Sequence, residues 1–392
     1  MPAEISVGIH DLSFRTTSFV LPHTELARYN GTDVAKYHKG LGQLSMSVPA
    51  VDEDIVTLAA AAALPLVQHH GADTIRTVVL ATESSIDQSK AAGVYVHSLL
   101  GLPSQIRVIE VKQACYGATA ALQFAAALVH QDPAQRVLVI ASDISRYDLD
   151  SPGEATQGAA AAAMLVSADP ALLELSGTSG LFTADVMDFW RPNYRATALV
   201  DGKKSVAAYL EAVQSTWRDY VLRGGLPLEE FRTFCYHQPY TRMAFKAHQA
   251  LLEECGVHTN EETLHKAVGT TTVYNKVVGN SYTASLYLAL AAALDNCHDL
   301  DGETLGLFSY GSGSVAEFIA ARVRPGYRSH LRAGEHRESV NSRQTVDYET
   351  YRELSCQALP TDGNTYELPH QTRGPFRLAA LRDHQRIYEA SS

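Results

Sequence analysis

Short apolar runs alternate with longer alanine- and leucine-rich stretches from Ile5 to about Val323. Residues 77–81, 107–111 and 136–141 form compact runs of mainly aliphatic residues, which is typical of strands covered on both faces. We therefore predict that these three runs are central strands of a largely parallel sheet.

Predicted helices alternate with these strands, at residues 54–68, 91–100 and 115–129. Each combines a high alanine content with apolar residues three or four positions apart, which indicates a helix packed on a sheet. Strands alternating with helices of this length are typical of βαβ units, so the predicted fold class is α/β.

A second round of elements follows a polar middle section. Residues 231–236 and 304–310 are predicted strands, and residues 240–254 and 282–295 are predicted helices, the second of them buried. The repeated alternation of strands and helices predicts an internal duplication, and we divide the chain into residues 1–170 and 171–392. From about residue 325 the chain is more charged, which predicts a surface extension rather than a further domain.

The composition narrows the function. A chain of 392 residues exceeds the usual size of one hydrophobic core, which agrees with two units that share an interface. A net charge of −11 without a long basic run argues against nucleic acid as a partner. We recognise no signal peptide and no apolar stretch of membrane-spanning length, so we expect a soluble, cytoplasmic protein.

The five cysteines are widely spaced and include no CxxC pair, which predicts free thiols rather than disulfides or a zinc site. Cys115 lies directly after a predicted strand and at the start of a predicted helix. The unpaired N–H groups of a helix start favour a thiolate, so we expect Cys115 to be nucleophilic. The alternative is a buried small hydrophobic residue, which is how we interpret Cys235 and Cys297.

Two titratable residues follow predicted strands. Glu83 comes after residues 77–81, where open α/β sheets place their ligands, and partial desolvation would raise its pKa and suit it to proton abstraction. His237 comes after residues 231–236, and a thiol with a distant histidine is a pattern of covalent acyl chemistry. Without their companions, both would be ordinary strand-end residues.

Two polar segments complete the set of candidates. Asn280 directly precedes the buried helix predicted at residues 282–295. The glycine-rich turn 310–314, which contains Gly311 and Ser312, follows a strand and would direct backbone N–H groups at a carbonyl oxygen. Taken alone, such a turn is more often just a tight connection.

Eight motifs in order along the chain resemble the 3-hydroxy-3-methylglutaryl-CoA (HMG-CoA) synthase family of the thiolase-like superfamily. They are ATESSID, KQACYGATAAL, SDISRYDLDSPGEATQGAAAAAML, DFWRPNY, VDGKKS, CYHQPYTRM, VGNSYTASLY and FSYGSGSVAEF. The resemblance covers nearly the whole chain and implies two duplicated halves in a layered α-β-α-β-α core. It also implies a homodimer and a place in the mevalonate pathway of isoprenoid biosynthesis.

The resemblance implies a role for each motif residue. Cys115 corresponds to the nucleophile, Glu83 to the general acid/base and His237 to the catalytic histidine, while Asn280 corresponds to the asparagine that positions the acetoacetyl group. The remaining implied residues shape the acyl pocket or support the catalytic groups, and they are Asp143, Tyr147, Asp188, Phe189, Gly311 and Ser312, with the Ser312 amide as an oxyanion donor.

Contacts with the anionic part of coenzyme A are implied for four basic residues, which are Lys203, Lys204, Arg242 and Lys246. Each is otherwise an ordinary solvated side chain. Arg242 departs from the family because related sequences often carry lysine there, and the two side chains differ in hydration and hydrogen-bond geometry. No metal, flavin or nicotinamide cofactor is implied.

The implied reaction is a ping-pong condensation of acetyl-CoA with acetoacetyl-CoA through an acetyl-cysteine, followed by hydrolysis to HMG-CoA. One alternative is a polyketide β-branching synthase, whose acceptor is bound to an acyl carrier protein. Another is a catalytically inactive scaffold of the same fold. Mass analysis after incubation with acetyl-CoA would separate the inactive scaffold from the two enzymes.

Overall fold

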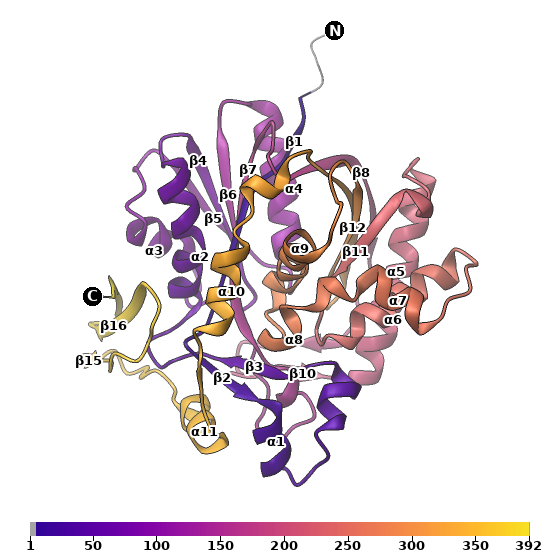
Figure 1. Cartoon of the computed structure of the whole chain (residues 1–392). Helices are drawn as coiled ribbons and strands as arrows, with labels where there is room; N and C mark the ends of the chain where they lie inside the picture. The colour runs from indigo at the N-terminus through magenta and orange to yellow at the C-terminus, as the bar shows by residue number, and fades with distance from the viewer. Residues whose placement is uncertain (1–4, 392) are drawn as a thin grey trace.

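A nine-stranded sheet organises the computed structural model, which describes residues 5–391 (Figure 1). Its strands follow the order β11 (Phe231–Tyr236), β12 (Thr304–Gly311), β13 (Val315–Val323), β8 (Leu173–Thr183), β1 (Val7–Thr16), β7 (Ala159–Ala168), β6 (Arg136–Ile144), β4 (Ile75–Ala81) and β5 (Arg107–Val111). The pairs Gly8–Glu174 and Ile9–Leu173 join β1 to β8. The sheet thus has two parts. The N-terminal part consists of β1, β7, β6, β4 and β5, and the C-terminal part consists of β11, β12, β13 and β8.

The two parts of the sheet share one pairing pattern. In the N-terminal part β4 is parallel to β6, β6 is antiparallel to β7, and β7 is antiparallel to β1. In the C-terminal part β11 is parallel to β12, β12 is antiparallel to β13, and β13 is antiparallel to β8. This correspondence supports the duplication proposed from the sequence, with β4 equivalent to β11 and β6 equivalent to β12.

Helices cover both parts and fill the space between them. Helices α2 (Ile55–His70) and α3 (Ala92–Leu99) pack on the outer face of the N-terminal part. Helices α4 (Gly117–Gln131) and α9 (Ser285–Asn296) lie in the central layer, and α5 (Gly202–Leu222) and α6 (Arg242–Glu254) pack on the C-terminal part (Figure 1). The predicted layered α/β fold is confirmed.

Alternation along the strands explains these layers. In β4, Val78 and Leu80 belong to the outer apolar cluster, whereas Val79 and Ala81 belong to the central cluster. Successive side chains of a strand point to opposite faces, so a run that is apolar at every position can be buried on both. A buried strand between two helical layers is what the compact runs predict.

The predicted elements agree with the structure within a few residues, with three corrections. The sheet is mixed rather than largely parallel, because five of its eight strand pairs are antiparallel. The strand at 107–111 is not central, because β5 is the edge of the sheet and Ile109 is 38% exposed. The helix predicted from Cys115 begins at Gly117, after a turn that contains Cys115. Apolar content alone does not distinguish an edge strand from a central one, since β5 pairs on one side.

The remaining segments surround this core. A small sheet of β14 (Gln344–Thr345), β2 (Phe19–Pro22) and β3 (Ser45–Val48) packs with α1 (His23–Tyr29) and α11 (Tyr348–Cys356). After α10 (Ala333–Asn341), the C-terminal strands β15 (Tyr366–Glu367), β16 (Phe376–Arg382) and β17 (Gln385–Ala390) form a sheet beside α2 and α3 (Figure 1). Among residues 5–391, no helix has the length and apolar character needed to cross a membrane.

Candidate active site

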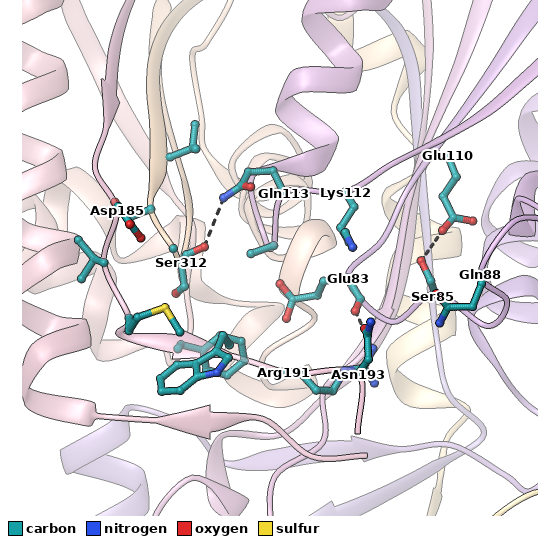
Figure 2. Close-up of a pocket in the computed structure, with 18 of the residues that line it drawn as sticks. Glu83, Ser85, Gln88, Glu110, Lys112, Gln113, Asp185, Arg191, Asn193 and Ser312 are labelled. Carbon is teal, nitrogen blue, oxygen red and sulfur yellow. Dashed lines mark hydrogen bonds between the residues drawn. The ribbon is translucent and has the colours of Figure 1, made fainter. Parts of the chain in front are cut away.

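Two cavities meet where the strands of both parts of the sheet end. The Cys115 cavity has a volume of about 430 Å³, and its lining includes Cys115, His237 and Asn280. The Glu83 cavity has a volume of about 1090 Å³, and Glu83 lies in its wall (Figure 2). Phe189 and Ser312 line both cavities and therefore separate them.

Cys115 lies in the turn between β5 and α4. The preceding residue, Ala114, has a φ of +43°, a left-handed conformation that is costly for a residue with a side chain. Cys115 is 8% exposed, and its Sγ lies 3.6 Å from Oε2 of Glu83. The turn thus brings a buried thiol into contact with a carboxyl group from the neighbouring strand.

The electrostatics of Cys115 differ from the sequence-based prediction. Burial raises the pKa of the Cys115 thiol well above its ordinary value, and the nearby Glu83 and Asp143 raise it further. The predicted thiolate is therefore wrong for the free protein, because burial and two acids outweigh the helix start. The thiol instead donates a hydrogen bond to Glu83.

Glu83 is placed by the end of β4 and faces the thiol. Burial raises its pKa well above the ordinary glutamate value, and the negative charge of Asp143 raises it further. The hydrogen bond from Cys115 and the positive charge of Arg191 act in the opposite direction on this pKa. Arg191 also donates a hydrogen bond of 2.9 Å to the backbone carbonyl of Glu83.

Asp143, near the end of β6, holds this part of the site together. Its Oδ1 accepts hydrogen bonds from the Thr82 hydroxyl, the Glu83 N–H, and the N–H and hydroxyl of Ser84. Its Oδ2 accepts from the N–H and the hydroxyl of Thr283. Burial raises the pKa of the Asp143 carboxyl, and these donors oppose that effect. Asp143 thus ties the Glu83 loop to the segment before α9.

His237 directly follows β11 and is fully buried. Its backbone N–H donates to the Phe308 carbonyl at 2.9 Å, and its own carbonyl accepts from the Tyr209 hydroxyl at 2.6 Å. Burial lowers the pKa of the imidazole to about 3. Within residues 5–391 its Nδ1 has no hydrogen-bond partner. A neutral imidazole, with one N–H and one acceptor nitrogen, therefore faces the cavity.

Asn280 reaches the cavity through a close backbone contact. A Cβ atom on Gly279 would lie 1.9 Å from the Gln157 carbonyl oxygen, and Gly279 has a φ of +88°, so only glycine fits. The Asn280 N–H donates to the Thr156 carbonyl at 2.9 Å, and its Oδ1 accepts from the Tyr282 N–H at 2.9 Å. These bonds leave the N–H groups of its amide for another acceptor.

The turn between β12 and β13 lies against the Cys115 segment. A Cβ atom on Gly311 would lie 2.4 Å from the Gln113 carbonyl oxygen and 2.7 Å from the Tyr116 nitrogen, so the approach requires glycine. The backbone N–H groups of Cys115 and Ser312 donate to no acceptor within residues 5–391. Both are therefore available to a carbonyl oxygen beside the thiol.

Of the other predicted pocket residues, Tyr147 and Phe189 line the Cys115 cavity, whereas Asp188 does not. Phe189 packs edge-on against Tyr147 and Tyr282, with ring centroids 6.0 and 5.7 Å away, and these three rings line the Cys115 cavity. Asp188 is fully buried and accepts hydrogen bonds from the Tyr310 hydroxyl at 2.8 Å and the Gly313 N–H at 3.0 Å. Asp188 thus supports the Ser312 turn.

The four predicted basic residues lie around the Cys115 cavity without entering it. Lys203 and Lys204 are exposed and are flanked in the chain by Gly202 and Ser205, which line the cavity. Lys246 donates to the hydroxyl of the lining residue Tyr240 at 3.1 Å, and Arg242 lies 3.4 Å from Glu261. Their placement is compatible with a polyanionic ligand at the cavity entrance.

Sequence reasoning missed several residues of the site. Arg191 and Thr283 belong to motifs that were recognised, yet only the structure shows that they contact Glu83 and Asp143. Tyr209 lines the cavity from α5, a helix that was not predicted. Among residues 5–391, no group of three or more His, Cys, Asp or Glu side chains is arranged to hold a metal ion.

Comparison with known sequences identifies relatives along most of the chain. The family described as hydroxymethylglutaryl-coenzyme A synthase N terminal matches residues 3–171, and the corresponding C-terminal family matches residues 249–354. The hydroxymethylglutaryl-CoA synthase of Enterococcus faecalis is 39% identical, with 91% of this chain and 94% of that protein covered. The polyketide biosynthesis 3-hydroxy-3-methylglutaryl-ACP synthase PksG of Bacillus subtilis is 31% identical, with 89% and 88% covered.

Solved structures of related synthases superpose on nearly the whole chain. An HMG-CoA synthase complexed with CoA superposes with a TM-score of 0.93 at 38% identity and covers 98% of this chain and 100% of its own. The curacin biosynthetic pathway HMG synthase in complex with acetyl donor-ACP also has a TM-score of 0.93, at 30% identity, with the same coverage.

Proposed function

Because the chain belongs to the hydroxymethylglutaryl-CoA synthase family, we propose that it condenses acetyl-CoA with acetoacetyl-CoA to give HMG-CoA and CoA. The observation that supports this proposal best is the pair of Cys115 and Glu83. Their side chains are 3.6 Å apart, and Cys115 shares its cavity with His237 and Asn280. A thiol that holds an acyl group and a carboxylate that removes a proton are both required for this condensation.

In the first half-reaction, Cys115 attacks the acetyl-CoA carbonyl and loses its proton along the hydrogen bond to Glu83. The C–S bond to CoA breaks, CoA leaves with that proton, and an acetyl thioester remains on Cys115. The N–H groups of Cys115 and Ser312 stabilise the oxyanion, a role in which losing one donor typically costs ~10²–10³ in rate.

In the second half-reaction, Glu83 removes a methyl proton from the acetyl thioester. The resulting carbanion attacks the ketone carbon of acetoacetyl-CoA, which His237 and Asn280 hold by hydrogen bonds. The new alkoxide takes up the proton that Glu83 removed, which gives the 3-hydroxyl group and restores the Glu83 carboxylate. A neutral imidazole supplies an N–H donor without adding a buried charge, which agrees with the low pKa of His237. Water then cleaves the thioester on Cys115, and HMG-CoA is released.

The supporting residues follow from the geometry. Asp143 positions the Glu83 loop, Asp188 positions the turn of Gly311 and Ser312, and Tyr147 and Phe189 form the acyl pocket. We assign contacts with the CoA phosphates to the four basic residues near the cavity entrance, which are Lys203, Lys204, Arg242 and Lys246. The family also supports a homodimer, and the exposed edge strand β5 offers a surface for it.

A carrier-protein-bound acceptor is the second candidate. It is supported by the 31% identity with PksG and by the likeness to the curacin synthase in complex with donor-ACP. The 39% identity with a CoA-dependent synthase favours free acetoacetyl-CoA. A competition assay that offers acetoacetyl-CoA and a carrier-bound acceptor together distinguishes the two, since the preferred acceptor is consumed first.

The decisive experiment is steady release of HMG-CoA from acetyl-CoA plus acetoacetyl-CoA. Intact mass measurement after acetyl-CoA alone should show one added acetyl group on the wild type and none on Cys115→Ala. An acetyl group on Cys115→Ala would reject that residue as nucleophile. A wild type that takes up no acetyl group would instead indicate an inactive scaffold.

A further inference from the structure

A series of hydrogen bonds connects the C-terminal extension with the wall of the Cys115 cavity. The hydroxyl of Tyr351, in α11, donates to Oε1 of Glu154 at 3.1 Å and accepts from Nε2 of Gln157 at 2.8 Å. Oε1 of Gln157 accepts from the backbone N–H of Tyr147 at 2.8 Å. We call these four residues the Tyr351 network. Tyr147 lines the cavity, whereas the other three members lie behind its wall.

The donors at one end fix the direction of the bonds in the Tyr351 network. The Tyr147 N–H can only donate, so the Gln157 amide turns its oxygen toward Tyr147 and its N–H groups toward Tyr351. The Tyr351 oxygen must then accept, which leaves its hydrogen for Glu154. Without the Tyr351 hydroxyl, Nε2 of Gln157 would lose the one acceptor that it has among residues 5–391.

The network is shielded from water. Tyr351 is 2% exposed, Glu154 is 1% exposed and Gln157 is 8% exposed. A buried polar group that loses its partner pays the full cost of desolvation, because no water takes the partner's place. The Gln157 amide would therefore move toward another acceptor if the Tyr351 hydroxyl were removed.

The backbone of Gln157 contacts a second residue of the cavity. Gln157 forms an isolated parallel bridge with Asn280, and the Asn280 N–H donates to the Thr156 carbonyl at 2.9 Å. Gly279 packs so closely on Gln157 that an added Cβ would lie 1.9 Å from its carbonyl oxygen. A displacement of Gln157 therefore reaches Asn280 as well as Tyr147, and both line the cavity.

The groups that take up the acetyl group lie outside these contacts. Sγ of Cys115 donates to Glu83, and among residues 5–391 neither side chain is hydrogen-bonded to the Tyr351 network. Asn280, in contrast, is assigned above to the acceptor thioester. On the basis of the proposed function, we propose that Tyr351 is a positioning residue that acts through Gln157 on the binding of acetoacetyl-CoA.

The test removes a single hydroxyl group. Tyr351→Phe keeps the ring but takes away the acceptor of the Gln157 amide. At saturating acetyl-CoA, kcat/KM for acetoacetyl-CoA should fall about tenfold, mainly through a higher KM, because a displaced Asn280 binds the acceptor less well. Acetylation by acetyl-CoA alone, followed by intact mass, should keep the wild-type rate.

Tyr348→Phe is the matched control. Tyr348 lies in the same helix, is 1% exposed, and has its hydroxyl 3.4 Å from the same oxygen of Glu154. Among residues 5–391 this hydroxyl forms no hydrogen bond with Gln157. Tyr348→Phe should therefore keep the wild-type KM. Urea denaturation should show a similar loss of stability in both variants, so that stability does not explain the difference in KM.

A double-mutant cycle tests whether Tyr351 acts through Gln157. Gln157→Met keeps the approximate length of the side chain and removes its amide, so it should raise the KM for acetoacetyl-CoA at least as much as Tyr351→Phe. Adding Tyr351→Phe to Gln157→Met should then cause no further rise, because the contact is already lost. A merely structural role of Tyr351 would instead give effects that multiply.

Four outcomes would count against the proposal. A wild-type KM in Tyr351→Phe, or a slowed acetylation equal to the loss in condensation, would reject a role confined to the acceptor. Multiplying effects in the combined variant would reject the action through Gln157. These three outcomes leave the proposed function intact. A wild type that releases no HMG-CoA from the two thioesters would reject that function and this proposal with it.

Discussion

The two parts of the sheet place different chemistry at equivalent positions. Glu83 follows β4 and His237 follows β11, and these strands have the same place in the shared pairing pattern. Likewise, Asp143 lies near the end of β6, and the turn of Gly311 and Ser312 lies at the end of the equivalent strand β12. Equivalent strand ends thus converge on the same site.

The difference between the parts is electrostatic. The N-terminal part places two acids and a thiol close together, and desolvation raises the pKa of all three. The C-terminal part contributes a neutral imidazole whose pKa is about 3, a side-chain amide and backbone N–H groups. In the proposed reaction, the N-terminal part moves protons and bonds covalently, whereas the C-terminal part supplies neutral hydrogen-bond donors.

The substitution expected to have the largest effect removes the proton-accepting carboxylate of the N-terminal part. Glu83→Gln keeps the shape of the side chain but cannot accept the methyl proton, so condensation should fall by ~10²–10⁴. Acetyl uptake should persist at a reduced rate, because Cys115 is intact but its proton must pass to solvent instead of Glu83. Single-turnover release of HMG-CoA and intact mass measure the two steps separately. Condensation at the wild-type rate would reject Glu83 as the base.

The substitution Gly311→Ala tests the hydrogen-bond donors of the C-terminal part. The added Cβ would overlap the Gln113 carbonyl, so the turn must shift and displace the Ser312 N–H. Acetylation and condensation should both fall by ~10²–10³, since both form an oxyanion. Gly177→Ala, where nothing lies within 4 Å of the added Cβ, is the matched control and should retain activity. Unchanged rates in Gly311→Ala would contradict the assignment.

Asp143→Asn should change the pH dependence of condensation. Condensation requires ionised Glu83, so its rate falls as the pH drops through the pKa of Glu83, which lies above the ordinary value. Because Asp143 helps to raise that pKa, removing its charge should move the acidic limb of kcat/KM to lower pH. Lost hydrogen bonds to the loop should also lower the maximal rate by up to about 10²-fold.

The control for this profile is His237→Gln. A histidine with a pKa near 3 contributes no limb above about pH 4, so the limb should stay where it is in the wild type. If the acidic limb moved in His237→Gln but not in Asp143→Asn, the titrating group would be His237 in the C-terminal part, and the assignment to Glu83 would be rejected.

The smallest effect is expected at Cys235, the thiol of β11. Burial raises the pKa of this thiol as well, but it lies in the apolar central cluster without an acid beside it. Cys235→Ala should therefore take up acetyl normally and lower the free energy of unfolding by about 1 kcal/mol. Urea denaturation and intact mass check both statements. Loss of acetyl uptake in Cys235→Ala would contradict the interpretation of Cys235 as a structural residue.

Much of the fold follows from local patterns. The ends of β4, β6, β11 and β12 agree with the predicted runs within a few residues, because compact apolar runs bounded by polar motifs mark buried strands. The alanine-rich segment Ala159–Ala168 was not assigned, since alanine favours helices, yet it forms β7 between β1 and β6. There, burial on both faces outweighs helix propensity.

Local sequence patterns show which side chains are available and where the strands and helices end, beside which Glu83, Cys115, His237 and Asn280 lie. Their chemical state depends on the folded structure. The raised pKa of Cys115 depends on burial and on acids that precede and follow it in the chain by roughly thirty residues. The folded structure also determines that two cavities reach one reaction centre, because cavity walls are built from segments that meet only in the folded protein.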